Sequence, residues 1–253
     1  MTVRNEGAIE AAAISPLGHD EAQDLFVAEV GRTTELLRTL SPDDWRSQTD
    51  CPAWDVRQMY LHVLGAHESG ASTRELVHQL WASSRYRRAH GGPPHAALSY
   101  VQVAERESLT PADLTSRLEK AGLAAARSRR RMLAPIRAIR MNADPDYEKW
   151  SLGYLNDTIY LRDLWMHRVD ATRATNRPMI LTPEHDGRIV ADIVAEWTRR
   201  HDKPTTLELT SQAGGTYVSH GGGERVTLDA VEYCRILAGR APAQGLMTTQ
   251  VPF

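Results

Sequence analysis

The stretch Arg162-Asp-Leu-Trp-Met-His-Arg-Val-Asp170 lies within a patterned segment that runs from residue 154 to about residue 175, and it decides the fold. Apolar residues recur in this segment at the spacing of an amphipathic helix: Leu155, Ile159, Met166 and Val169. At about 100° per residue, Asp163, His167 and Asp170 fall within roughly 60° of one another, next to the apolar side. The sequence therefore predicts a helix that carries carboxylates and an imidazole at the edge of its buried face.

An aspartate and a histidine four residues apart can bind one metal ion, because side chains on adjacent helical turns lie about 5 to 6 Å apart. The alternative is structural: Asp163 pairs with an arginine such as Arg162, and His167 is a core histidine. A metal would need a further ligand from elsewhere. A helix that starts near Asp55 offers His62, at the edge of its apolar stripe, and His67, near the centre of the stripe. Periodicity alone does not decide which of the two histidines faces the core.

Helical periodicity predicts four helices in the first part of the chain, over residues 20–40, from 55 onward, 112–132 and 154–175. The second pattern extends through Leu76, Val77, Leu80 and Trp81. Breakers separate the segments at Ser41-Pro42, Gly91-Gly-Pro-Pro94 and Asp144-Pro145. The three tryptophans near the predicted site are interpreted as packing anchors: Trp45, Trp54 and Trp165.

The pattern changes near residue 180. A helix is predicted over 184–200, and alternating segments with glycine turns between them predict short strands at 205–210, 216–220 and 225–228. Asp229 and Gly239 suit the start and end of a final helix over 230–238. We therefore predict a mainly α protein: a loose leader over 1–19, a four-helix bundle over 20–180 and a small α+β domain over 181–253.

Composition narrows the function. The 253 residues include 30 Lys and Arg against 32 Asp and Glu, a net charge of −2, so no general electrostatic attraction to nucleic acid or to an anionic membrane is expected. Two cysteines, Cys51 and Cys234, stand far apart, which argues against a disulfide framework and suits the reducing cytoplasm. No apolar run is long enough to span a membrane. A small-molecule or protein partner is expected.

Three groups of residues resemble the mycothiol-dependent maleylpyruvate isomerase family, which lies within the DinB/YfiT-like metal-binding superfamily. The first comprises Asp44-Trp45, Thr49 to Arg57 and Leu61 to Leu64, and the second is the helix of Arg162 to Asp170. The third lies at the end of the chain: Gly215 to Arg240 and Val251-Pro-Phe253. The resemblance covers most of residues 20–253.

This resemblance implies a DinB-like four-helix bundle that binds one divalent ion, usually zinc, through His62, Asp163 and His167. The family's isomerase has glutamate at the position of Asp163, so this chain offers a carboxylate that is one methylene shorter. Two histidines and one carboxylate leave a coordination position open, as in catalytic zinc sites. Asp170 is a candidate to orient one of the imidazoles, with an ordinary surface charge as the alternative.

The resemblance also implies a cofactor, mycothiol, which is a low-molecular-weight thiol of actinobacteria. A divalent cation favours thiolate over thiol, and the thiolate is the nucleophile. The expected activity is either cis–trans isomerisation of a maleylpyruvate-like acid or transfer of the thiol to an electrophile. Arg240 resembles an arginine that binds the substrate carboxylate, and Arg57 and Arg168 are the alternatives. The competing hypothesis is a noncatalytic protein of the same fold that binds a divalent metal or a small ligand.

Overall fold

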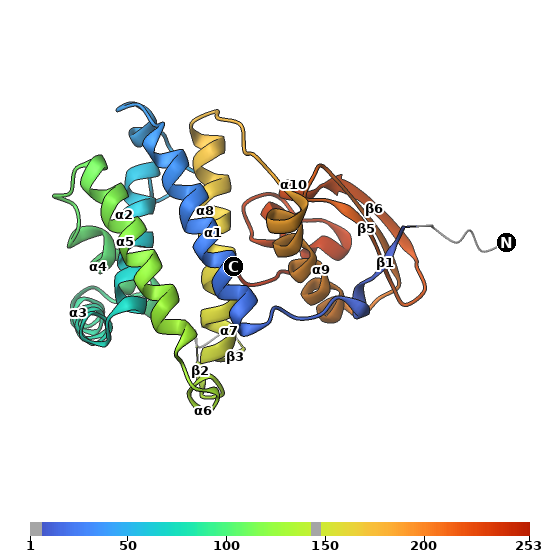
Figure 1. The fold of residues 1–253 in the computed structure, drawn as a ribbon, viewed down its shortest axis with the longest axis horizontal. Helices are drawn as coiled ribbons and strands as arrows, with labels where there is room; N and C mark the ends of the chain where they lie inside the picture. The colour runs from blue at the N-terminus through green and yellow to red at the C-terminus, as the bar shows by residue number, and fades with distance from the viewer. Residues whose placement is uncertain (1–6, 143–147) are drawn as a thin grey trace. The chain divides into compact units, whose positions relative to one another are not determined.

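The computed structural model describes residues 7–142 and 148–253. The predicted break at Asp144-Pro145 lies outside the described residues. The chain forms two compact units: Gly18–Pro178 is mainly helical, and residues 7–17 join Met179–Phe253 in a smaller α+β unit. Each unit has buried apolar side chains of its own. The colour in Figure 1 follows the chain from one unit to the other.

Four long helices make the bundle of the first unit: α1 (His19–Arg38), α2 (Val56–Ala71), α5 (Pro111–Arg130) and α8 (Tyr160–Ala174). α1 and α2 each pack against both α5 and α8, so the helices enclose one core (Figure 1). Fully buried side chains from all four helices fill it: Phe26, Val30, Leu61, Leu64, Leu114, Leu118, Leu164 and Trp165. The predicted mainly helical fold class is confirmed.

Local sequence signals set the starts of two bundle helices. Asp55 caps α2, since its carboxylate accepts a hydrogen bond from the Gln58 backbone N–H and the Gln58 side-chain oxygen accepts one from the Asp55 backbone N–H. Thr110 caps α5, since its hydroxyl oxygen accepts a hydrogen bond from the Asp113 backbone N–H, and Pro111 occupies the first helical position, where no backbone donor is needed. These two starts agree with the prediction from the sequence.

The second helix is shorter than its pattern predicts. It ends at Ala71, because Ser72 takes an extended conformation and its side chain caps a new helix, α3 (Thr73–His90). Leu80 and Trp81, predicted to continue the buried stripe, are 52% and 56% exposed. α3 packs with α4 (Pro94–Ala104) beside α2, outside the four-helix core.

The last bundle helix is interrupted at its start. The chain passes from α7 (Leu152–Tyr154) through a π-helical turn, Leu155–Ile159, into α8. Asp157, in that turn, binds Arg137 and His19, with Nη2–Oδ2 and Nδ1–Oδ1 distances of 2.5 and 2.8 Å. A short α6 (Ala134–Arg137) and the hairpin of β2 (Arg140–Asn142) and β3 (Lys149–Ser151) precede it.

The smaller unit contains a four-stranded sheet of order β1-β5-β4-β6. β4 (Thr205–Thr210) pairs antiparallel with β5 (Gly215–Ser219) and parallel with β6 (Glu224–Asp229). The helices of this unit are α9 (Arg188–His201) and α10 (Ala230–Leu237), which bury Trp197 and Tyr233 against each other with ring centroids 5.5 Å apart.

The described part of the predicted leader is ordered, contrary to expectation. β1 (Ile9–Glu10) pairs in parallel with β5, where Ile9 faces Tyr217, and Ala11 just after it is buried. An edge strand of two residues is too short to produce a period-two pattern, so periodicity could not predict it. Among the described helices, none is long and apolar enough to cross a membrane.

Candidate metal centre

α8 places a histidine between two carboxylates. His167 is 3% exposed; its Nε2 lies 3.3 Å from the Asp163 Oδ1 atom, and its Nδ1 lies 3.2 Å from the Asp170 Oδ2 atom. Asp163 and Asp170 lie one turn before and one turn after His167, so the geometry follows directly from their spacing on a helix. Asp170 is fully buried, while the Asp163 side chain keeps 27% of its surface exposed.

α2 brings His62 to the same place. Its ring lies edge-on to His167, with centroids 5.9 Å apart, and stacks on Trp54 at 4.8 Å. His62, Asp163 and His167 each offer one potential ligand atom, and these atoms lie within 4.8 Å of one another. The structure thus brings together the three residues that the resemblance implies as ligands.

His67, the histidine that periodicity left as an alternative, lies apart from this group. Its ring meets the edge of Phe26 at 5.2 Å, and its Nδ1 lies 3.4 Å from the Leu118 carbonyl oxygen. Burial lowers its pKa to about 3. His67 is therefore a neutral histidine of the bundle core.

The protonation of the cluster suits a cation. Burial lowers the pKa of His62 to about 4, so its imidazole is neutral at pH 7, which is the form that binds metals. Its Nδ1 is buried and has no hydrogen-bond partner among the described residues. Burial also acts to lower the pKa of His167, but Asp163 and Asp170 outweigh it and raise that pKa well above its usual value. A positive charge is thus favoured between these groups, and a divalent ion fits the residues present.

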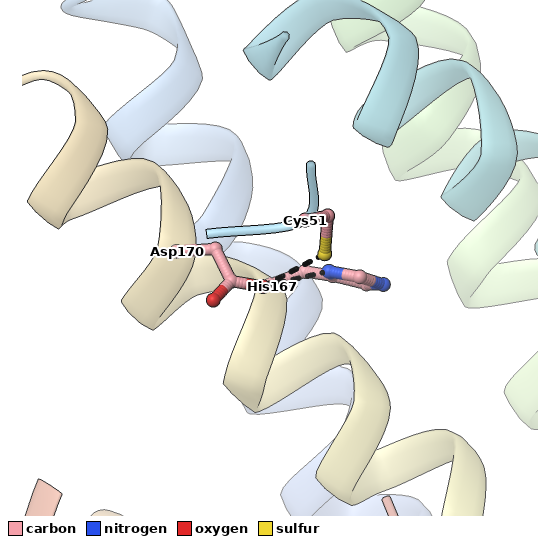
Figure 2. A group of neighbouring side chains, drawn as sticks. All are labelled: Cys51, His167 and Asp170. Atoms are coloured by element: carbon pink, nitrogen blue, oxygen red, sulfur yellow. Dashed lines mark hydrogen bonds and ion pairs between the residues drawn. The ribbon is translucent and has the colours of Figure 1, made fainter. Parts of the chain in front are cut away.

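Cys51 lies on the other side of His167 and was not predicted to be near the site. Figure 2 shows its side chain directed at the pair of His167 and Asp170; its Sγ lies 3.7 Å from the Asp170 Oδ2 atom. Cys51 lies in a loop before α2. Thr49 closes this loop, because its hydroxyl donates a hydrogen bond to the Trp54 carbonyl at 2.7 Å. Nothing in the sequence indicated which helix this loop contacts.

The three arginines considered for substrate binding differ in their surroundings. Arg168 is buried and binds Glu29, with Nε–Oε1 and Nη2–Oε2 distances of 2.6 and 3.0 Å. Arg57 donates to the backbone carbonyls of Glu107 and Leu109. Arg240 follows α10 in the smaller unit, where its backbone N–H donates to the Arg235 carbonyl at 2.9 Å. Its role toward a substrate stays a prediction.

The fold and this cluster define a class: a four-helix-bundle protein with two histidines and a carboxylate grouped in its core, followed by a small α+β unit. The family model of the mycothiol maleylpyruvate isomerase N-terminal domain matches residues 26–172, which is more than half of the chain. The chain belongs to this family. The match spans all three residues of the cluster.

Solved structures agree with this assignment at the level of the fold. Crystal structures of the mycothiol-dependent maleylpyruvate isomerase and of a histidine-to-alanine mutant of it each superpose with a TM-score of 0.57 at 14% sequence identity. Each comparison covers 89% of this chain and 90% of the other. No curated protein matches the chain.

Proposed function

We propose that this protein is a metal-dependent enzyme that uses mycothiol, either to transfer the thiol to an electrophile or to isomerise a maleylpyruvate-like acid. The observation that carries the proposal is the grouping of His62, Asp163 and His167 in the core of the bundle. Two imidazoles, which bind metals in their neutral form, and one carboxylate are a donor set of catalytic zinc sites. A cytoplasmic location fits an enzyme whose cofactor is a thiol.

Exposure supports a catalytic rather than a purely structural role for the cluster. His62 and Asp163 are partly exposed, whereas His167 and Asp170 are buried. We propose that a small thiol approaches the cluster from the side of His62 and Asp163, because these are its partly exposed residues. A divalent ion, when bound here, would favour the thiolate form of the cofactor.

The chain's own residues would then position the reaction. Asp170 would hold the His167 ring in one orientation through Nδ1, and Trp54 would fix the His62 ring by stacking. Attack of the thiolate on a cis double bond, rotation about the resulting single bond and elimination would give the trans product and regenerate the thiol. Attack on an electrophile with a leaving group would give the S-conjugate instead. Both reactions are proposed, because Asp163 is one methylene shorter than the glutamate of the family's isomerase.

The test is turnover of two substrates by zinc-loaded protein, with and without mycothiol: maleylpyruvate and a chromogenic electrophile. We expect turnover of at least one substrate that requires both the thiol and the metal and that is lost in His62→Ala. The matched control is His78→Ala, because His78 lies on α3 and binds Glu105 instead. Absence of turnover, or turnover that does not need the thiol, would contradict the proposal and favour a noncatalytic metal-binding or ligand-binding protein.

A further inference from the structure

Arg129, on α5, is buried without a hydrogen-bond partner. It is 1% exposed, and its Nε, Nη1 and Nη2 atoms have no acceptor among the described residues. Its Cζ atom lies over two aromatic rings, 4.6 Å from the centroid of Phe26 and 4.1 Å from that of Tyr160. These ring contacts leave its N–H donors without an acceptor among the described residues.

Stacking on these rings does not satisfy the N–H donors. The carboxylates of Asp157 and Asp163 favour the charge of Arg129, but its guanidinium donates a hydrogen bond to neither of them. A cation over an aromatic ring gains less than a buried charge loses when it has no hydrogen-bonded partner. Burial lowers the pKa of Arg129 to about 10, so the side chain stays charged at neutral pH. Other buried arginines of the same unit are paired: Arg106 with Glu68 and Glu75, and Arg168 with Glu29.

The position of Arg129 connects it to the candidate metal centre. Tyr160, whose ring contacts Arg129, lies on α8 one turn before Asp163 and two turns before His167, on the same side of the helix. At 1.5 Å per residue, these steps are about 4.5 and 10 Å along the helix axis. Tyr160 and Asp163 are both partly exposed, so this side of the helix reaches solvent beside the arginine.

α2 makes room for the guanidinium. Gly70 lies two turns after His62, and a Cβ atom at Gly70 would lie 2.9 Å from the Arg129 Nη2 atom. A side chain at this position would therefore displace the arginine. The helices that supply His62, Asp163 and His167 thus also hold Arg129 in place.

We infer that Arg129 forms a subsite for a carboxylate group of a small organic acid, at the end of the bundle core that lies beyond Asp163. A guanidinium fork binds a carboxylate through two parallel hydrogen bonds, which would supply the missing acceptors. Tyr160, which contacts Arg129, lies about 4.5 and 10 Å along α8 from Asp163 and His167, a spacing that suits a short dicarboxylic acid whose other end reacts at the candidate metal centre. In this respect the inference rests on the proposed function, because it names the class of substrate for that site.

The experiment measures binding of maleate, an unreactive cis dicarboxylate in the absence of thiol, by titration calorimetry on zinc-loaded and on metal-free protein. The variants are Arg129→Met and Arg129→Lys, and the control is Arg127→Met, since Arg127 is exposed on the same helix. We expect Arg129→Met to weaken maleate binding at least tenfold and Arg129→Lys to weaken it less, with the zinc content of both unchanged. Arg127→Met is expected to bind maleate as the wild type does.

Wild-type affinity for maleate in a folded Arg129 variant, or no maleate binding by the wild type, would overturn the inference. If Arg129→Met does not fold, Arg129→Lys decides, because it keeps the charge and most of the volume but lacks the fork. The two proposals fail separately. Arg129-dependent maleate binding in a protein without thiol-dependent turnover would contradict the proposed function and support the carboxylate subsite.

Discussion

His67 is a buried imidazole whose charge state links stability to pH. Burial, assisted by the nearby Arg129 charge, lowers its pKa from 6.5 to about 3 in the folded protein. Between these two values the unfolded chain binds a proton that the folded chain does not, so stability falls as the pH falls. The slope attributable to this one residue approaches about 1.4 kcal/mol per pH unit.

His67→Gln isolates this effect, because other acid-sensitive groups act equally in both proteins. We expect the free energy of unfolding of the wild type, relative to that of the variant, to decrease from pH 6.5 toward pH 4. Urea denaturation at a series of pH values measures it. Parallel pH profiles for the two proteins would show that His67 does not carry the predicted shift.

Asp170 contacts the ring nitrogen of His167 that faces away from Asp163. A carboxylate in this position fixes the orientation of a ligating imidazole and makes it more basic, and the loss of such a partner costs about 10- to 100-fold in metal affinity. We therefore predict that Asp170→Asn binds zinc about 10- to 100-fold more weakly than the wild type, measured by competition with a chelator. Unchanged zinc affinity would identify Asp170 as a structural partner only.

Single-residue patterns could predict this cluster only in part. The spacing of Asp163, His167 and Asp170 fixes their proximity, because all three lie on one helix. Periodicity could not predict which histidine, His62 or His67, joins the cluster. A helical wheel gives the direction of a side chain but not which helix that side chain meets. His67 packs on Phe26 of α1, and only the fold supplies that neighbour.

At the scale of elements, α1 and α5 approach closely where α5 has a glycine. A Cβ atom at Gly122 would lie 2.8 Å from Val30 Cγ2 and 3.0 Å from His67 Nδ1, and both of these side chains are buried. We predict that Gly122→Ala destabilises the fold by about 1 to 3 kcal/mol, as overpacking of a core does.

Gly31→Ala is the matched control on α1. A Cβ atom there meets nothing within 4 Å, so the substitution removes only backbone entropy from the unfolded chain and should stabilise the fold by about 0.5 to 1 kcal/mol. Urea denaturation compares the two variants with the wild type. If both substitutions changed the free energy of unfolding in the same direction, α1 and α5 would not approach closely at Gly122.

The elements that sequence predicted well are those with local signals. Caps at Asp55 and Thr110 mark the starts of α2 and α5. The break at Ser72 was missed because the apolar pattern runs on into α3, although its residues there face outward. The π-helical turn before α8 was missed because Asp157 binds distant partners, His19 and Arg137, which no periodicity encodes.

At the scale of the whole molecule, Arg240 is predicted to bind a carboxylate of the substrate. An arginine fork that binds a substrate carboxylate contributes a charge-assisted pair of hydrogen bonds, and its loss should raise KM for the acid about tenfold or more. We predict this for Arg240→Met, with the metal content unchanged, by steady-state kinetics with maleylpyruvate. A KM equal to that of the wild type would remove Arg240 from the site.

The sequence predicts a change of pattern near residue 180, and the two compact units of the structure divide after Pro178. One connection within the smaller unit could not be predicted. The short strand β1 joins the sheet of the smaller unit from the other end of the sequence. Such a contact depends on the completed sheet edge, and the two residues involved carry no pattern of their own.

The central claim is that the bundle holds one divalent ion between α2 and α8. The most direct measurement is metal per chain, by mass spectrometry of proteins purified side by side without chelator. The set comprises the wild type, His62→Ala, Asp163→Ala, His167→Ala and the control His78→Ala. The account predicts about one divalent ion per chain in the wild type and the control and little in the other three. A wild type that is metal-free and takes up no added zinc, or equal metal in all five proteins, would contradict it.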